Sequence, residues 1–311
     1  MTRCVTNGRN HTLIPSLAIL ASTLFWGTLW IPLRALDHAG LGGAWATTAG
    51  FTIPLLCLLP GAFVRRRRIV AGGRSLLGTG LLAALGIALY AQGLLRGEVA
   101  RVILLFYLMP VWSTLLAWRI LGHSITRGRI LTIGLGLTGM VAVFGGDHSL
   151  PLPRTPADWM GLLSGFCWGW SLVRLRRAED TASFDEVFVQ FVLLGPSFFL
   201  LTLVSGTGSP SLADAVISPR TIEWLSLFGL VWMPGAIWLT LYGSSRIDPA
   251  RAAILLMFEV VVGLVSAAIL TNEPIFPSEL LGAALILAAG ISEFFFGPEP
   301  SSASLARVSL W

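Results

Sequence analysis

Glu259 is the residue whose chemistry stands out, because it lies within the apolar stretch ILLMFEVVVG. An acidic side chain at the centre of a bilayer costs about 2.5 to 3.5 kcal/mol on insertion scales, and such residues usually face a cavity or a partner. The carboxyl group could contact a substrate amine or bind a proton. The alternative is structural, a protonated carboxyl group that is hydrogen-bonded to a neighbouring helix.

Aromatic residues form the second group of candidates. A Trp-Gly pair occurs in FWGTLW and again 142 residues later in CWGWSL, both inside apolar runs. A tryptophan in mid-membrane needs a polar partner or a cavity for its indole N–H, and cavities for apolar ligands are lined by such side chains. Ordinary helix packing is the alternative for each. We predict as substrate-binding residues Trp26, Tyr90, Tyr107, Trp112, Trp168, Trp238, Tyr242, Met257 and Glu259.

Two prolines are candidates for gating or hinge positions, Pro110 and Pro234. Each removes a backbone donor inside an apolar run and so favours a kink or hinge. A structural kink without gating is the alternative.

The sequence lacks the motifs that metal binding, nucleotide binding and disulfide formation would require. The four histidines form no HExxH motif, no glycine-rich stretch is followed by Gly-Lys-Ser/Thr, and the three cysteines are scattered. We therefore predict no metal site, no cofactor and no enzymatic activity.

Composition indicates that membrane-spanning helices must position these residues. Hydrophobic residues make up 55% of the chain and charged residues only 12%, and the mean hydropathy is +0.78. Apolar runs of about 20 residues predict transmembrane helices, whereas a transmembrane β-barrel would show shorter alternating segments. The ten predicted spans are 13–36, 42–64, 75–95, 99–121, 129–146, 158–177, 185–206, 222–243, 250–271 and 278–297.

The arginines predict the orientation. All 21 basic residues are arginine, and 16 of them fall on the inner side if the N-terminus is cytoplasmic, against five outside. This asymmetry follows the positive-inside rule with both termini cytoplasmic. The run RRRR at 65–68 is then a topology determinant beside anionic lipid, and we expect no nucleic-acid partner.

An internal repeat appears when the sequence is shifted by 150 residues, which places 100–125 over 250–275. Each half contains five predicted spans, with Trp-Gly in the first and Ala-Arg at the start of the fourth. Because five is odd, the second half must enter the membrane from the opposite side, a plan typical of secondary transporters. The predicted organisation is an N-terminal tail at 1–12, a first repeat at 13–146, a loop at 147–157, a second repeat at 158–297 and a C-terminal tail at 298–311.

These features resemble the drug/metabolite transporter superfamily, in its ten-helix EamA-type exporter branch. The resemblance rests on Trp-Gly in each first span, the Ala-rich fourth spans, Pro110, and the acidic residue of Asn272-Glu273. The chain departs from the family pattern where Val260 matches Pro110 and where His123 matches Glu273. Within the branch it is most similar to bacterial exporters of aromatic and other amino acids.

The expected protein is an all-α, polytopic exporter of the bacterial inner membrane that works by alternating access. The resemblance and the aromatic residues favour amino acids as substrates, and we expect a monomer. A multidrug or cationic-metabolite exporter is the alternative within transport. A non-transporting membrane scaffold or receptor is the alternative from another class.

Overall fold

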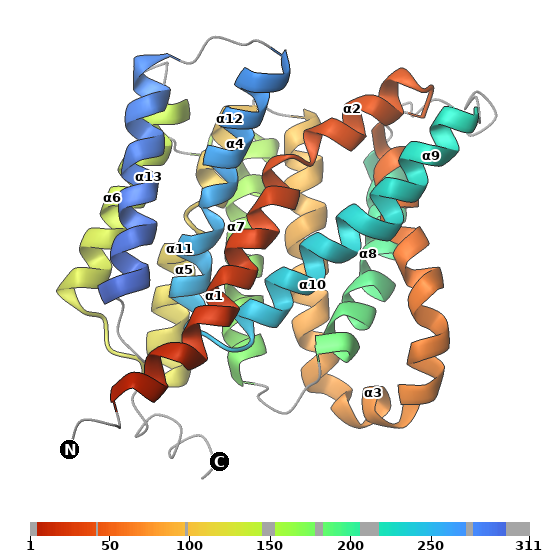
Figure 1. The fold of residues 1–311 in the computed structure, drawn as a ribbon. Helices are drawn as coiled ribbons and strands as arrows, with labels where there is room; N and C mark the ends of the chain where they lie inside the picture. Colours follow the sequence, from red (N-terminus) through yellow and green to blue (C-terminus); the bar gives the residue numbers. More distant parts are fainter. Residues whose placement is uncertain are drawn as a thin grey trace.

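The computed structural model describes residues 5–41, 43–96, 99–144, 153–177, 183–205, 218–271 and 276–296. Every regular element in these ranges is a helix (Figure 1). In lipid, backbone donors and acceptors must be satisfied within the segment, and a helix does this for an apolar run. The all-α prediction is confirmed.

Each predicted span contains helix among the described residues, with ends that differ from the predictions by a few residues at most places. The first half contains α1 (Val5–Gly27), α2 (Trp30–His38), α3 (Gly43–Arg96), α4 (Val99–Phe106), α5 (Met109–Leu116), the π-helical turn η1 (Ala117–Leu121) and α6 (Arg127–Phe144). The second half contains α7 (Pro156–Arg177), α8 (Ser183–Ser205), α9 (Pro219–Leu227), the π-helical turn η3 (Phe228–Trp232), α10 (Met233–Ser244), α11 (Pro249–Leu256), α12 (Phe258–Thr271) and α13 (Pro277–Phe296).

The boundaries differ from expectation at two places. Helix α1 begins at Val5, eight residues before the predicted span, and α3 joins two predicted spans through the arginine run. Gly73 turns α3 back on itself with φ 45° and ψ −132°, a conformation that a side chain would disfavour. Figure 1 shows the resulting hairpin at the end of the molecule where α1 begins.

Five described stretches are long and apolar enough to cross a membrane by themselves. They are Thr12–Leu36, Thr48–Gly93, Val102–Leu121, Pro219–Ser244 and Pro249–Leu270. A polytopic membrane protein is therefore confirmed, while the count of ten spans stays a prediction.

The two halves run in opposite directions. Helix α1 begins at the lower end of the molecule in Figure 1, whereas α7, the first helix of the second half, ends there. The helix contacts show the same relation. Helix α10 lies antiparallel to α1, with Gly243 against Pro15 and Gly235 against Phe25, and α7 lies antiparallel to the second leg of α3, with Gly93 against Ala157.

The two Trp-Gly pairs explain how the halves pack together. A Cβ atom on Gly27 of α1 would clash with the carbonyl oxygen of Glu259, and one on Gly169 of α7 would lie 3.2 Å from the carbonyl oxygen of Met109. Met109 and Glu259 are themselves 150 residues apart. The first helix of each half thus packs closely on the fourth span of the other half at equivalent positions, where glycine leaves the necessary space.

Candidate functional site

The fourth span of each half is broken in the middle of its apolar run. In the first half the break lies at Tyr107 and Leu108, between α4 and α5, and in the second half at Met257, between α11 and α12. Tyr107 and Met257 are 150 residues apart, so the breaks are equivalent in the repeat. Interrupted helices at corresponding places in two inverted halves are typical of transporter substrate sites.

The breaks share a hydrogen-bond pattern in which the helix tightens. Leu108 N donates to Leu105 O and Met257 N donates to Ile254 O, over 3.3 and 3.1 Å. Bonds of this i to i−3 type replace the α-helical ones, and short tightened stretches inside a helix often mark hinges.

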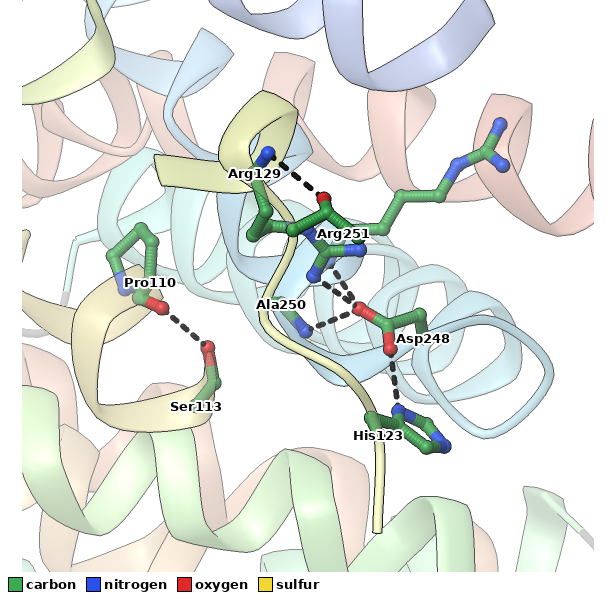
Figure 2. Close-up of polar contacts among 8 residues, drawn as sticks. Pro110, Ser113, His123, Arg129, Asp248, Ala250 and Arg251 are labelled. Carbon is green, nitrogen blue, oxygen red and sulfur yellow. Dashed lines mark hydrogen bonds and ion pairs between the residues drawn. The ribbon is translucent and has the colours of Figure 1, made fainter. Parts of the chain in front are cut away.

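The prolines predicted as hinges both begin a helix. Pro110 lies in the first turn of α5, where its carbonyl oxygen accepts a hydrogen bond from Ser113 Oγ at 3.2 Å (Figure 2). Pro234 lies in the first turn of α10, directly after η3. Proline is well suited to a first turn because the N–H it lacks has no partner there. The break at Met257 forms without a proline, so proline is not what creates the pair of breaks.

The residues at the two breaks belong to the same apolar cluster. Tyr107 and Met257 are both buried, and they belong to one apolar cluster with Leu104, Met140 and Val260. Met257 also fills the space beside Gly136 of α6. The side chains at the two equivalent breaks therefore lie in one buried cluster that contains residues of both halves.

Glu259 lies in the first turn of α12, two residues after the break, and its side chain is half-buried. Tyr90 of α3 and Tyr107 both interact electrostatically with its carboxyl group. Phe106 connects the two tyrosines, with ring centroids 4.6 Å from Tyr90 and 5.1 Å from Tyr107. We call Tyr90, Phe106, Tyr107 and Glu259 the Glu259 cluster. It joins three aromatic rings from one half to an acid from the other.

Two donors beside the break lack hydrogen-bond partners among the described residues. The Tyr107 hydroxyl is fully buried near the Glu259 carboxyl group and has no hydrogen-bond partner among the described residues. Trp112 Nε1 is also buried without a partner, while its ring meets Phe166 edge-on at 5.8 Å. Because buried donors are nearly always hydrogen-bonded, these two groups are available to a ligand or to water.

The structure places the other predicted site residues outside this cluster. Trp26 Nε1 donates to Thr240 Oγ1 at 3.0 Å, and Trp168 is buried in an apolar cluster with Met109. Trp238 is exposed beside Phe184, and the Tyr242 ring lies 4.0 Å from the Arg246 guanidinium carbon. Tyr90, Tyr107, Met257 and Glu259 are thus brought together, with Trp112 nearby on α5.

A second polar group, which the sequence did not predict, lies between α10 and α11. Asp248 Oδ1 accepts hydrogen bonds from Arg129 Nη1 at 2.6 Å and from the backbone N–H groups of Ala250 and Arg251 at 3.0 Å each (Figure 2). Its Oδ2 lies 2.7 Å from His123 Nδ1. Asp248 before Pro249 matches a helix N-cap signal, but nothing in the sequence indicated its partners from the other half.

The charge of Asp248 depends on these partners. Burial would raise the pKa of its carboxyl group, but the His123 hydrogen bond and the Arg129 charge outweigh burial and hold the pKa well below its ordinary value. The carboxylate therefore contributes fully to stability above its ordinary pKa, and this contribution is lost only as the pH falls below that value. Asp248 is ionised throughout the physiological range.

Among the described residues, no three His, Cys, Asp or Glu side chains come close enough together to hold a metal ion. The arrangement at the breaks is instead an acid bordered by aromatic rings and unpartnered donors. Such a site can bind an organic molecule with a cationic group.

A model of the EamA-like transporter family matches residues 13–145 and again residues 155–291. The chain belongs to this family. Membership identifies it as a multi-pass membrane transporter built from two related halves, which contacts the bilayer and acts on small molecules. The double match agrees with the repeat predicted at a shift of 150 residues.

Relatives and solved structures agree with this EamA-like membership. An uncharacterized transporter of Archaeoglobus fulgidus is 26% identical, over 87% of this chain and 93% of its own length. An uncharacterized transporter of Helicobacter pylori is 22% identical, over 91% of this chain and 95% of its own length. One solved crystal structure superposes with a TM-score of 0.72 at 17% identity, over 89% of this chain and 95% of that one, which shows that the fold is shared.

Proposed function

We propose that this EamA-like protein exports amino acids with aromatic or other apolar side chains, or closely related metabolites. The observation that carries the proposal is the position of Glu259 beside Tyr90 and Tyr107, at the point where the broken fourth spans meet. In this proposal Glu259 binds the substrate ammonium group, and the aromatic residues contact its apolar side chain.

The chemistry of the Glu259 cluster supports an amphiphilic, positively charged group as ligand. A carboxylate forms strong charge-assisted hydrogen bonds with an ammonium group, and aromatic faces attract cations within about 6 Å of the ring centre. The Tyr107 hydroxyl and Trp112 Nε1 provide two further donors without partners among the described residues. Donors of this kind suit the substrate carboxylate, and the first turn of α5 adds the partial positive charge of a helix N-terminus.

Alternating access is the proposed mechanism, and the opposed directions of the two halves support it. When inverted halves exchange conformations, a site between them becomes open to the other side of the membrane. Tyr107 and Met257, one from each half, belong to one buried apolar cluster and lie in tightened turns. We propose that these turns are where the fourth spans bend, with Pro110 and Pro234 fixing the starts of the helices that follow α4 and η3.

Counterflow in proteoliposomes tests the substrate class. Purified protein is reconstituted with a high internal concentration of each unlabelled amino acid in turn, and uptake of the labelled form is followed at two pH values. We expect transient accumulation for aromatic and large apolar amino acids, and little for acidic ones. Equal accumulation of acidic and aromatic amino acids would contradict the role given to Glu259. A change of the transport rate with pH would show that transport depends on the binding of a proton.

A multidrug or cationic-metabolite exporter is the second candidate, favoured by one observation. The Glu259 cluster contains an acid and no basic side chain among its four residues. Counterflow of tetraphenylphosphonium without counterflow of any amino acid would favour this candidate. Absence of flux for every solute would instead favour a non-transporting scaffold or receptor.

The proposed location is the inner membrane of a bacterium, with both termini cytoplasmic. The hairpin of α3 supports this, because it carries the arginine run at the end of the molecule where α1 begins. Arginine-rich segments beside a membrane favour the cytoplasmic face.

A further inference from the structure

We infer that Asp248, Arg129 and His123 form a latch between the two halves. These side chains must separate before a solute can pass between the Glu259 cluster and the end of the molecule where α1 begins. The inference rests on the alternating access proposed above. It goes beyond that proposal because it assigns the closure of one end to a named group of charges.

The latch joins elements from both halves. Asp248 ends the short connection from α10 to α11 in the second half, whereas His123 and Arg129 flank the connection from η1 to α6 in the first half. Gly122, with φ 70°, turns the chain after η1 and precedes His123. Figure 2 shows both side chains of the first half converging on the carboxylate of Asp248.

The ion pair in the latch is buried. Side-chain exposure is 5% for Arg129 and 8% for Asp248, and 17% for His123. Separating a buried pair leaves an uncompensated charge, which is strongly unfavourable unless water replaces the partner. The latch is therefore stable while this end is closed and must be hydrated when it opens.

The surroundings of Asp248 are basic. Besides His123 and Arg129, the buried Arg251 follows on α11, and Arg176 of α7 donates from Nη1 to the Ser245 carbonyl at 3.2 Å in the same connection. Arg246 turns away to the Tyr242 carbonyl at 2.8 Å. The negative charge of Asp248 offsets the positive charge of Arg129, with which it forms an ion pair at this connection.

The location of the latch suits a closure. Gly243, at the end of α10, lies against Pro15 and Ile19 of α1, which places the latch at the end where α1 begins. Helix α11 has eight residues and leads from Asp248 to the break at Met257, a distance of about 12 Å at the α-helical rise. Between them lies an apolar layer with Met109, Ala252, Ala253 and Leu256. This layer separates the Glu259 cluster from the latch.

The two tasks of Asp248 can be separated by mutation. Its Oδ1 atom caps α11 and also accepts from Arg129. Asparagine caps a helix about as well as aspartate does, so Asp248→Asn removes the charge and keeps the cap. Arg129→Gln removes the partner without touching α11. Arg127→Gln is the matched control, because Arg127 is exposed on the same turn of α6.

The experiment measures how often the apolar layer is exposed to solvent. In a background with Cys4, Cys57 and Cys167 changed to Ser, Ala253→Cys adds a thiol to this layer, and N-ethylmaleimide labelling of the purified full-length protein is followed by mass spectrometry. Ala84→Cys, equally buried in a different apolar cluster, reports general unfolding. We expect Asp248→Asn and Arg129→Gln to speed labelling at position 253 roughly threefold to a hundredfold, the range of interaction free energies between contacting groups.

The predicted pattern is specific. Arg127→Gln and the charge-preserving Arg129→Lys should label slowly at position 253, and position 84 should stay slow in every variant. Unchanged labelling at position 253 in both latch variants would overturn the inference, as would equal acceleration at positions 84 and 253. Labelling needs no substrate, so a latch that opens as expected in a protein without counterflow would refute the proposed function and leave the latch standing.

Discussion

At the scale of single residues, Tyr107 is the most informative position after Glu259. Its hydroxyl is fully buried and has no hydrogen-bond partner among the described residues. A buried donor without a partner lowers the stability of the folded protein by about 1 to 3 kcal/mol. In a binding site this loss is recovered when a bound ligand accepts the hydrogen bond.

The change Tyr107→Phe separates binding from stability. We expect the midpoint of thermal unfolding without substrate to stay the same or rise, because the unpaired hydroxyl is gone. The KM for counterflow should rise by about threefold to tenfold, the usual worth of one hydrogen bond. Trp118→Phe, on an exposed tryptophan of η1, serves as the control. A lower unfolding midpoint together with an unchanged KM would show that the hydroxyl is structural.

The sequence predicted part of this site. Glu259 could be selected from the sequence because placing a carboxyl group in an apolar run costs free energy. Tyr107 and Met257 could be selected because they occupy equivalent positions of the repeat. Phe106, Asp248 and Arg129 were missed, because their roles depend on contacts between segments far apart in the chain. Trp238 was included on its position four residues before Tyr242, yet a shared helix face does not say whether that face meets protein or lipid, and Trp238 is exposed.

At the scale of helices, hydropathy predicted where apolar segments lie but not whether a helix continues through them. Every predicted span contains helix, because apolar runs must satisfy their own backbone. Pro110 indicated a kink near the break at Leu108, but no residue indicated the break at Met257, because the residues there are as apolar as their neighbours. The helix that continues through the arginine run could not be predicted from the sequence either, because a charged segment at a membrane surface can be a loop or a helix.

Close packing of α1 on α12 gives a prediction at this scale. A Cβ atom on Gly27 would clash with the Glu259 carbonyl oxygen and the Val262 side chain. Gly27→Ala should therefore lower the free energy of unfolding by about 1 to 3 kcal/mol, the usual cost of overpacking. It should also reduce counterflow, because the displaced carbonyl belongs to the residue proposed to bind substrate.

The matched control is Gly134→Ala in α6. Gly134 is exposed and a Cβ atom there would meet nothing within 4 Å. Alanine has a higher helix propensity than glycine, so this variant should be as stable as the original protein or more so. Equal effects of the two substitutions on the unfolding midpoint would mean that the contact between α1 and α12 is not tight.

At the scale of the whole molecule, the inverted repeat was predictable from an odd number of spans in each half and from landmarks repeated in the same order. The contacts of Gly27 with Glu259 and of Gly169 with Met109 give that repeat a physical meaning, because each half contributes its first helix to the other. No sequence feature indicated which end is closed, because closure depends on how the halves pack.

Orientation in the membrane provides a further prediction. Single cysteines replace Arg67 in the α3 hairpin and Arg220 at the start of α9, both exposed, in a cysteine-free background. With cytoplasmic termini, a membrane-impermeant maleimide should label Arg220→Cys in intact spheroplasts and Arg67→Cys only after the membrane is opened. The reverse labelling pattern would show that the topology is opposite to the predicted one. Labelling of both cysteines from the same side would show that Arg67 and Arg220 do not lie on opposite sides of the membrane.

Counterflow of a labelled aromatic amino acid by the Glu259→Gln variant measures whether the Glu259 carboxylate binds the substrate. Glutamine keeps the shape of the side chain but cannot carry the negative charge that binds an ammonium group. We expect the rate at subsaturating substrate to fall about tenfold to a hundredfold, the effect of losing a hydrogen bond to a charged group, while Glu223→Gln on the exposed face of α9 transports normally. Transport by Glu259→Gln at the original rate, with unchanged pH dependence, would show that the Glu259 charge does not bind the substrate.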